Sequence, residues 1–181
     1  MSELVARTGR HQQRYVDGYR LIAGCIPFRY KYSETDDGEP SEKNIEVLMI
    51  SSTSGPGLLF PKGGWENDET VKEAAVREAV EEAGVRGDLK HFLGEYYFKS
   101  KTLQDEFSPE GLCKAAMYAL LVKEELDSWP EKSLPGECCR HSWMKEALEE
   151  GFRKWLSDGM ISTMEENNHI LTSISSPKEE E

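Results

Sequence analysis

The sequence lacks an excess of positive charge and any long apolar run. Its 181 residues contain 22 Lys and Arg against 34 Asp and Glu, which gives a formal net charge of −12. This balance argues against nonspecific nucleic-acid binding and against attachment to an anionic membrane as the main activity. No stretch approaches the roughly 20 consecutive apolar residues of a membrane span. With 38% hydrophobic residues, the chain is suited to one globular domain with a sizeable core.

Cysteine is also scarce, and its spacing matches no metal site. The four cysteines are Cys25, Cys113, Cys138 and Cys139. An adjacent pair is not a zinc-binding motif, so we expect reduced thiols in the core. The start of the chain also lacks the apolar segment of a secretory signal. Both features favour a cytoplasmic protein, with the nucleus as the alternative.

The beginning of the chain departs from the overall acidity. From Met1 to Lys31 the basic residues are Arg7, Arg10, Arg14, Arg20, Arg29 and Lys31, against Glu3 and Asp17. A locally basic surface on an acidic protein would suit a highly anionic small molecule. The same arginines would suit import into an organelle, but the two acidic residues weaken that interpretation, and import is kept as the less favoured alternative.

The clearest local structure in the sequence is a helix that begins after Thr70 and ends before Gly84. Thr70 is a suitable cap, a glutamate three residues later completes a capping box, and Gly84 is a typical stop signal. On this helix Glu78, Glu81 and Glu82 project from one face as neighbours. Their repulsion becomes attraction when a hard cation such as Mg²⁺ or Mn²⁺ binds. A solvated acidic face with an incidental Arg-Glu pair is the alternative.

The residues around these glutamates favour the metal site. The stretch resembles the Nudix box, which reads Gly-x5-Glu-x7-Arg-Glu-U-x-Glu-Glu-x-Gly-U, where U is a bulky aliphatic residue. The matching residues are Gly63, Glu69, Arg77, Glu78, Glu81, Glu82, Gly84 and Val85. Ala79 departs from the pattern because it places a smaller side chain at a U position, which concerns local packing and not the chemistry.

The resemblance implies an α/β fold, a Nudix-type α/β/α sandwich around a mixed β-sheet. The predicted elements agree with this class, since strands lie on both sides of the helix. We expect strands at residues 20–30, 45–50, 91–99, 115–122 and 139–144, and helices at 145–156 and 158–166. Residues 33–44 and 100–110 are expected to be loops, and Pro27 is expected near an edge or a bulge.

The same resemblance divides the chain into four parts. They are a basic N-terminal segment at 1–17, the Nudix hydrolase domain at 18–157, a helical extension at 158–171 and a disordered acidic tail at 172–181.

Nudix enzymes hydrolyse a diphosphate linked to a further moiety, so the resemblance implies a hydrolase that uses Mg²⁺ or Mn²⁺, with more than one ion in the site. By this resemblance Glu78 and Glu82 would bind metal directly, and Glu81 would bind a further metal or its waters. The general base would be Glu78 or Glu81. Arg77 would brace the carboxylates and would not contact phosphate.

The loop before the box completes the implied site. It reads Phe60-Pro61-Lys62-Gly63-Gly64-Trp65. In the family, a backbone carbonyl at this point binds metal, and here it belongs to Lys62, where many Nudix enzymes have glycine. The Lys62 side chain would add charge near the phosphates. Gly63 and Gly64 allow a tight turn and close approach of the backbone.

This loop and the strand segment Gly-Cys-Ile-Pro-Phe-Arg resemble plant members of the diphosphoinositol polyphosphate and diadenosine polyphosphate branch. That resemblance implies release of the β-phosphate from diphosphoinositol polyphosphates, with diadenosine polyphosphates as a second substrate class. The residues that would contact this substrate are Arg20, Lys62, Gly63, Gly64, Lys114 and Arg140, with Arg14, Lys99, Lys101 and His141 as looser candidates. For each basic residue alone, an ordinary exposed side chain is the alternative.

Two other functions stay open. A Nudix hydrolase directed at nucleotides, such as dinucleoside polyphosphates, nucleotide sugars or capped RNA, would use aromatic stacking. The candidates for that stacking are Trp65, Tyr96, Tyr97 and Phe107. A catalytically silent binding module is disfavoured by the complete set of box carboxylates. We expect an anionic small molecule as the ligand, with no membrane and no obligate protein partner.

Overall fold

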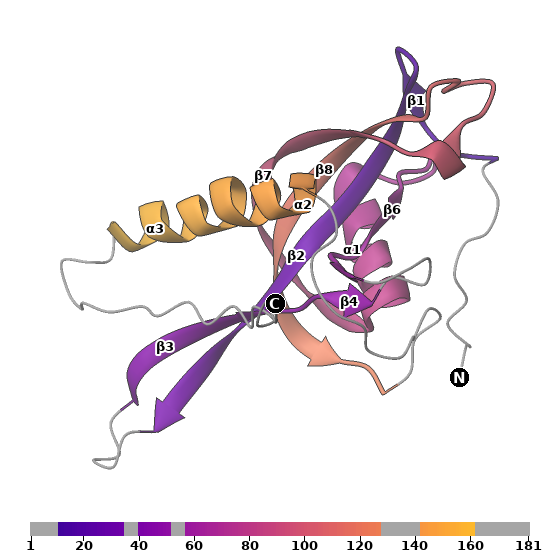
Figure 1. Cartoon of the computed structure of the whole chain (residues 1–181). Helices are drawn as coiled ribbons and strands as arrows, with labels where there is room; N and C mark the ends of the chain where they lie inside the picture. Colours follow the sequence, from indigo (N-terminus) through magenta and orange to yellow (C-terminus); the bar gives the residue numbers. More distant parts are fainter. Residues whose placement is uncertain (1–10, 35–39, 52–56, 128–141, 162–181) are drawn as a thin grey trace.

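A mixed six-stranded sheet lies at the centre of the computed structural model, which describes residues 11–34, 40–51, 57–127 and 142–161 (Figure 1). Its strands are β1 (Tyr15–Val16), β2 (Tyr19–Glu34), β3 (Pro40–Val47), β6 (Lys62–Gly64), β7 (Val85–Lys99) and β8 (Leu112–Glu125). Strand β2 pairs in parallel with β8, and β8 pairs antiparallel with β7. The opposite edge of β2 is shared by β1, β6 and β3, all antiparallel to it. The predicted α/β class and mixed sheet are confirmed.

Helices cover both faces of this sheet (Figure 1). Helix α1 (Val71–Ala83) lies on one face. On the other lies a continuous helical segment, which consists of α2 (Ser142–Glu146), the π-helical η2 (Ala147–Arg153) and α3 (Lys154–Ile161). A separate two-stranded sheet pairs β4 (Ile50–Ser51) with β5 (Leu58–Leu59), and the 3-10 turn η1 (Lys101–Leu103) lies in the loop between β7 and β8.

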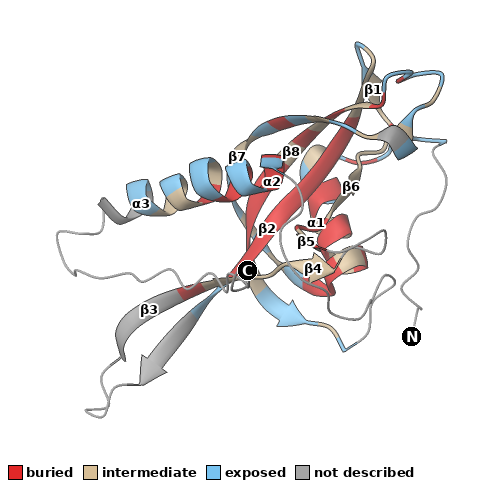
Figure 2. Ribbon diagram, viewed as in Figure 1, coloured by how far each residue is buried: buried red, intermediate tan, exposed pale blue. Residues whose placement is uncertain are grey.

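Alternation along β2 divides the core between the two helical layers. Ile26 and Phe28 belong to a cluster with Phe152 of the C-terminal helical segment, whereas Ala23 and Cys25 belong to a cluster with the alanines of α1. Figure 2 shows buried residues along β2 and α1, while the outer side of α3 is exposed. The sheet is therefore covered by large side chains on one face and by small ones on the other.

Pro27 is not at an edge or a bulge, contrary to the prediction, because β2 is an internal strand. Its position coincides with a change of partner, since β6 pairs with β2 before Pro27 and β3 pairs with it afterwards. On this edge the Cys25 N–H donates to the Pro61 carbonyl, and the Pro27 carbonyl accepts from the Leu48 N–H. Pro27 therefore directs its missing N–H into the gap between the two partner strands, where no ladder bond is lost.

Two further segments differ from the prediction. Residues 33–44 were expected to be a loop, but β2 continues to Glu34 and β3 begins at Pro40, with 35–39 outside the described residues. These strand ends are polar, so no apolar alternation reveals them. Residues 142–144 open a helix and not the end of a strand, because Trp143 and Met144 share a buried helical stripe with Ala147 and Leu148. Residues 139–141 lie outside the described part.

Candidate functional site

Helix α1 carries the candidate site, and both of its ends are fixed by local contacts. The Thr70 hydroxyl accepts from the Glu73 N–H at 3.2 Å, and the Glu73 carboxylate accepts from the Thr70 N–H at 3.1 Å. Gly84 ends the helix in the left-handed region, with φ 63°. The capping box and the stop predicted from the sequence are confirmed, so the phase of the helix, and with it the direction of each glutamate, is set locally.

The same face of α1 that packs on the sheet also holds carboxylates. Ala74, Ala75 and Ala79 are fully buried, and Glu78 and Glu81 are each only 7% exposed. The small side chain of Ala79, which departs from the box pattern, is therefore a packed core residue. Carboxylates this deeply buried need partners, since unpaired charge away from water is costly.

Arg77 is the shared partner. Its Nε and Nη2 donate to the two carboxylate oxygens of Glu69 at 3.0 and 2.7 Å. Its Nη1 donates to Glu78 at 2.7 Å and to Glu81 at 3.1 Å, and Nη2 also donates to the Gly64 carbonyl at 2.8 Å. Burial opposes the charge of Arg77, but the hydrogen bonds and charges of these glutamates raise its pKa. One guanidinium thus fixes three carboxylates and the β6 backbone.

The negative charge of the site exceeds what Arg77 offsets. Burial raises the pKa of Glu78 to about 8, and the nearby charge of Glu82 acts in the same direction against Arg77. Added positive charge would relieve this repulsion, and carboxylate oxygens are the ligands that Mg²⁺ prefers. In the described ranges no three carboxylate, imidazole or thiol groups already meet at one point, so a bound cation would need further oxygen ligands.

Strand β6 places a backbone oxygen next to these carboxylates. The Lys62 N–H donates to Glu82 at 2.8 Å, while the Gly64 carbonyl on the same edge faces Arg77. Because N–H and C=O of one strand residue point to the same edge, the Lys62 carbonyl also faces α1. The approach is close, since a Cβ at Gly63 would lie 2.2 Å from a carboxylate oxygen of Glu78. A side chain at this position would displace the Glu78 carboxylate.

The N-terminal segment holds the turn between β6 and α1. The Arg14 guanidinium lies 4.5 Å from the centre of the Trp65 ring and donates to the carbonyls of Glu66, Asn67 and Glu69 at 3.1 Å each. The Trp65 indole also donates to the Glu69 carbonyl. Arg14 was predicted as a looser substrate contact, but its hydrogen bonds go to the backbone of this turn.

Gln13 is a second residue of this contact, and the sequence analysis missed it. It is 7% exposed, donates to the Leu21 carbonyl at 2.8 Å and accepts from Arg20 Nε at 3.0 Å. A Cβ at Gly64 would lie 2.0 Å from its side-chain oxygen. The glycine at 64 is the only sequence signal of this contact, because the pair is separated by about fifty residues.

The structure places two of the predicted substrate cations, Arg20 and Lys114, on opposite faces of the sheet. Sheet register pairs Arg20 with Cys113, on the face of the C-terminal helical segment, and pairs Lys114 with Leu21, on the α1 face. Lys114 contacts Glu95 at 3.1 Å, and this hydrogen bond raises its pKa. Arg140 and His141 lie outside the described residues, as does the side chain of Lys101, and the Lys99 side chain is exposed on β7.

The four aromatic residues that were candidates for base stacking differ in how far they are exposed. Tyr96 is 9% exposed and packs near Trp143, so it is a core residue. Trp65 is held under Arg14. Tyr97 and Phe107 are more than half exposed. Within the described part of the chain, no helix is long and apolar enough to cross a bilayer.

Residues 35–157 match the family described as NUDIX domain. Over 171 residues the chain is 68% identical to Nudix hydrolase 16, mitochondrial, of Arabidopsis thaliana, a match that covers 89% of this chain and 95% of the relative. It is 32% identical to diphosphoinositol polyphosphate phosphohydrolase 3-beta of Bos taurus, over 71% of this chain and 66% of that protein. A C. elegans Ap4A hydrolase in a binary complex has a similar fold, with a TM-score of 0.50 and 18% identity, over 76% of this chain and 98% of that one.

These relatives correct the predicted location. Nudix hydrolase 16 and four further Arabidopsis thaliana relatives carry the word mitochondrial in their names. The expectation of a cytoplasmic or nuclear protein is therefore wrong. It gave too much weight to Glu3 and Asp17 against the more numerous arginines of the same segment.

Proposed function

We propose that this chain, which belongs to the Nudix hydrolase family, hydrolyses a phosphoanhydride bond at the acidic face of α1. The observation that carries the proposal is the excess of buried carboxylate over guanidinium around Arg77, with the pKa of Glu78 raised to about 8. Buried acids that remain under-compensated in a folded protein are typical of functional sites.

Nudix hydrolases generally use divalent metals such as Mg²⁺. In this chain we assign Glu78, Glu82 and the Lys62 carbonyl as the direct ligands, and Glu81 as the ligand of a further ion or its waters. Carboxylates and carbonyls form the oxygen donor set that such ions require. The metal would neutralise the diphosphate and lower the pKa of the attacking water.

The protein groups around this donor set have separate tasks. Arg77 positions Glu78 and Glu81 through the two hydrogen bonds of its Nη1 and is itself oriented by Glu69. Glu78 or Glu81 accepts the proton of the attacking water. Glu82 is held by the Lys62 N–H, which keeps its carboxylate next to β6. Catalysis then depends mainly on position and charge.

For the substrate, we propose diphosphoinositol polyphosphates with release of the β-phosphate, and diadenosine polyphosphates as a second class. The 32% identical Bos taurus relative is named for the first substrate. The proposed contacts are Arg20, the Lys62 side chain, Gly63, Gly64, Lys114 and Arg140. Since Arg20 and Lys114 lie on opposite faces of the sheet, we do not expect one phosphate to contact both.

Glu82→Gln tests the reaction. The variant keeps the size of the side chain but removes a charged metal ligand, so turnover of both substrate classes should fall by orders of magnitude while the fold is kept. Glu73→Gln is the matched control, because Glu73 is exposed on the same helix and glutamine preserves the capping box. EDTA should abolish wild-type activity, and Mg²⁺ should restore it. Undiminished turnover in Glu82→Gln, or in EDTA, contradicts the assignment.

We also propose import into mitochondria, because five relatives carry that word in their names. A fluorescent protein fused to the C-terminus should co-localise with a mitochondrial marker in plant cells. Replacing Arg7 and Arg10 by glutamate should reduce the overlap, and a diffuse signal from the unchanged fusion would contradict the proposal.

A further inference from the structure

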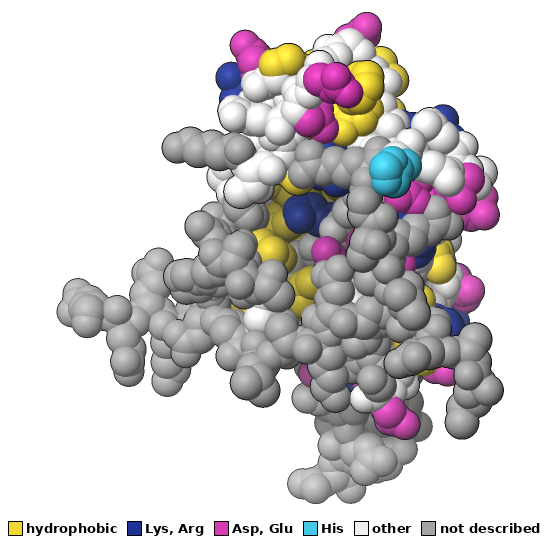
Figure 3. Space-filling view, turned by 90° about the vertical axis from the view of Figure 1, so that its right-hand side faces the viewer, with side chains coloured by type: hydrophobic (Ala, Val, Ile, Leu, Met, Phe, Trp, Pro, Cys, Tyr) yellow, Lys and Arg dark blue, Asp and Glu magenta, His cyan; other side chains and the backbone are white. Residues whose placement is uncertain are grey.

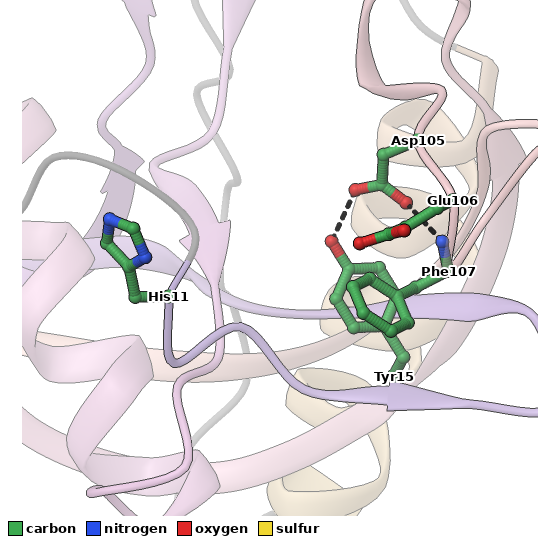
Figure 4. Close-up of a pocket in the computed structure, with 5 residues that line it drawn as sticks. All are labelled: His11, Tyr15, Asp105, Glu106 and Phe107. Atoms are coloured by element: carbon green, nitrogen blue, oxygen red, sulfur yellow. Dashed lines mark hydrogen bonds between the residues drawn. The ribbon is translucent and has the colours of Figure 1, made fainter.

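A polar hollow lies between the N-terminal segment and the loop that joins β7 to β8. It has a volume of about 460 Å³ and is lined by His11, Tyr15, Asp105, Glu106 and Phe107 (Figure 4). His11 lies across the opening from the rings of Tyr15 and Phe107, and Asp105, Glu106 and Phe107 come from the loop between β7 and β8. No step of the proposed hydrolysis uses these residues.

The aromatic wall of the hollow is held in place by Asp105. One carboxylate oxygen accepts from the Tyr15 hydroxyl at 2.5 Å, and the other accepts from the N–H groups of Phe107 and Ser108 at 3.0 and 2.8 Å. The rings of Tyr15 and Phe107 lie 5.3 Å apart. Ser108 is fully buried and donates to the Leu112 carbonyl. The rings are therefore positioned before any ligand arrives, which lowers the entropic cost of binding.

Two groups at this wall remain open to a ligand. Phe107 is 60% exposed, although it lies in a fixed loop and not at a chain end. Within the described residues, no hydrogen bond or ion pair is formed by the Glu106 carboxylate. Figure 3 shows acidic and hydrophobic side chains close together at the upper end of the molecule, where β1 and the β7–β8 loop lie. An exposed ring beside a hydrogen-bond acceptor suits a flat molecule that carries an N–H donor.

The charge of the hollow selects which end of a substrate can bind there. Asp105 and Glu106 are both acidic, so a phosphate group would be repelled. An amino-substituted purine base has an aromatic face for Phe107 and an exocyclic amino group for Glu106. We propose that this hollow binds the purine base of a nucleotide substrate while its phosphates lie at α1. The proposal rests on the proposed function, and specifically on its second substrate class.

Hydrogen bonds of the N-terminal segment place one wall of the hollow next to the turn before α1. The residues between His11 and Tyr15 contact the turn before α1, because the Gln12 carbonyl accepts from the Asn67 N–H at 2.7 Å and Arg14 donates to the backbone of the same turn. A ligand with its base in the hollow is therefore adjacent to the segment that supports Glu69.

Binding of adenosine to the full chain in EDTA tests the proposal without hydrolysis. Titration followed by NMR should show saturable shifts for wild type, and binding should weaken about tenfold to a hundredfold in Phe107→Ala, by analogy with stacked bases. Phe107→Tyr should retain binding because it keeps the ring. Purine riboside, which lacks the amino group and has no other N–H donor on its base, should bind less tightly than adenosine, and Glu106→Ala should remove that difference.

Phe92→Ala is the matched control, since Phe92 is another exposed ring, 46% accessible, on β7. It should bind adenosine as wild type does. Absence of binding to wild type, or equal weakening in Phe92→Ala and Phe107→Ala, overturns the proposal. Because EDTA is present and no bond is cleaved, this result is independent of the metal assignment.

Steady-state hydrolysis gives the second readout. Phe107→Ala should raise KM for diadenosine tetraphosphate far more than for a diphosphoinositol polyphosphate. Equal changes for both substrates would mean that the hollow supports the fold and binds no base. If the proposed hydrolysis is wrong but the hollow does bind a base, wild type would cleave neither substrate and would still bind adenosine.

Discussion

The two faces of the central sheet are packed with side chains of different size. On the α1 face the contacts are small, with Ala23 and Cys25 of β2 against Ala74, Ala75 and Ala79. The opposite face is packed with large side chains, which include Phe28, Met144, Phe152 and Trp155. Small residues contribute less apolar burial, but they let the helix backbone approach the sheet and carry carboxylates into a buried position. The face that stabilises the fold is thus separate from the face that carries the chemistry.

Phe152→Ala should produce the largest effect on stability. Phe152 is fully buried, and its ring centre lies 5.3 Å from that of Phe28. Its loss should reduce the free energy of unfolding by about 3–5 kcal/mol, as measured by urea denaturation. Turnover per folded molecule should stay near that of wild type at low temperature. If turnover falls while the fraction folded does not, the two faces are coupled and the comparison fails.

Gly63→Ala should lower activity while it leaves stability nearly unchanged. The new Cβ would overlap the Glu78 carboxylate, which is the end of a flexible side chain and can move aside with little cost to the fold. We expect kcat to fall about a hundredfold, as a small misplacement of a catalytic group can cause, with a nearly unchanged unfolding midpoint. Gly18→Ala is the control, since Gly18 has φ +79° and open space around it, so it should lose stability and keep kcat. Wild-type kcat in Gly63→Ala would contradict the close contact.

A third prediction concerns how the stability of the metal-free protein depends on pH. The pKa of Glu78 rises from its usual 4.5 to about 8 on folding. Between these values the unfolded chain releases a proton that the folded chain keeps, so stability should be full below about 4.5 and should decline as the pH rises through 8. Glu78→Gln should flatten this decline in denaturation curves recorded in EDTA. A slope identical to that of wild type would show that Glu78 is not the group responsible.

The sequence was informative where structure is local. The capping box of α1, its stop at Gly84 and the row of glutamates all lie within fifteen residues, and the structure has them as predicted. The bracing of the glutamates by Arg77 was also predicted from the spacing of Arg77 to Glu69 and Glu81, and Arg77 donates hydrogen bonds to both.

Contacts between distant segments could not be predicted in this way. Gln13 and Arg14 act on a turn more than fifty residues away, and neither belongs to a motif. Whether Arg20 and Lys114 share a face depends on the register of two strands far apart in the chain. Pro27 was predicted near an edge or a bulge because proline is rare inside sheets. The sequence does not reveal that the internal strand β2 changes its partner at this residue.

The contact of the N-terminal segment with the turn before α1 limits how the chain can be trimmed. If import is followed by removal of a leader, the peptidase must cut before Gln12, because Gln12, Gln13 and Arg14 all bond to residues 65–69. A cut a few residues later would leave the Nudix box covalently intact but would release the turn that holds Glu69. The position of such a cut would therefore decide whether the turn that holds Glu69 keeps these hydrogen bonds.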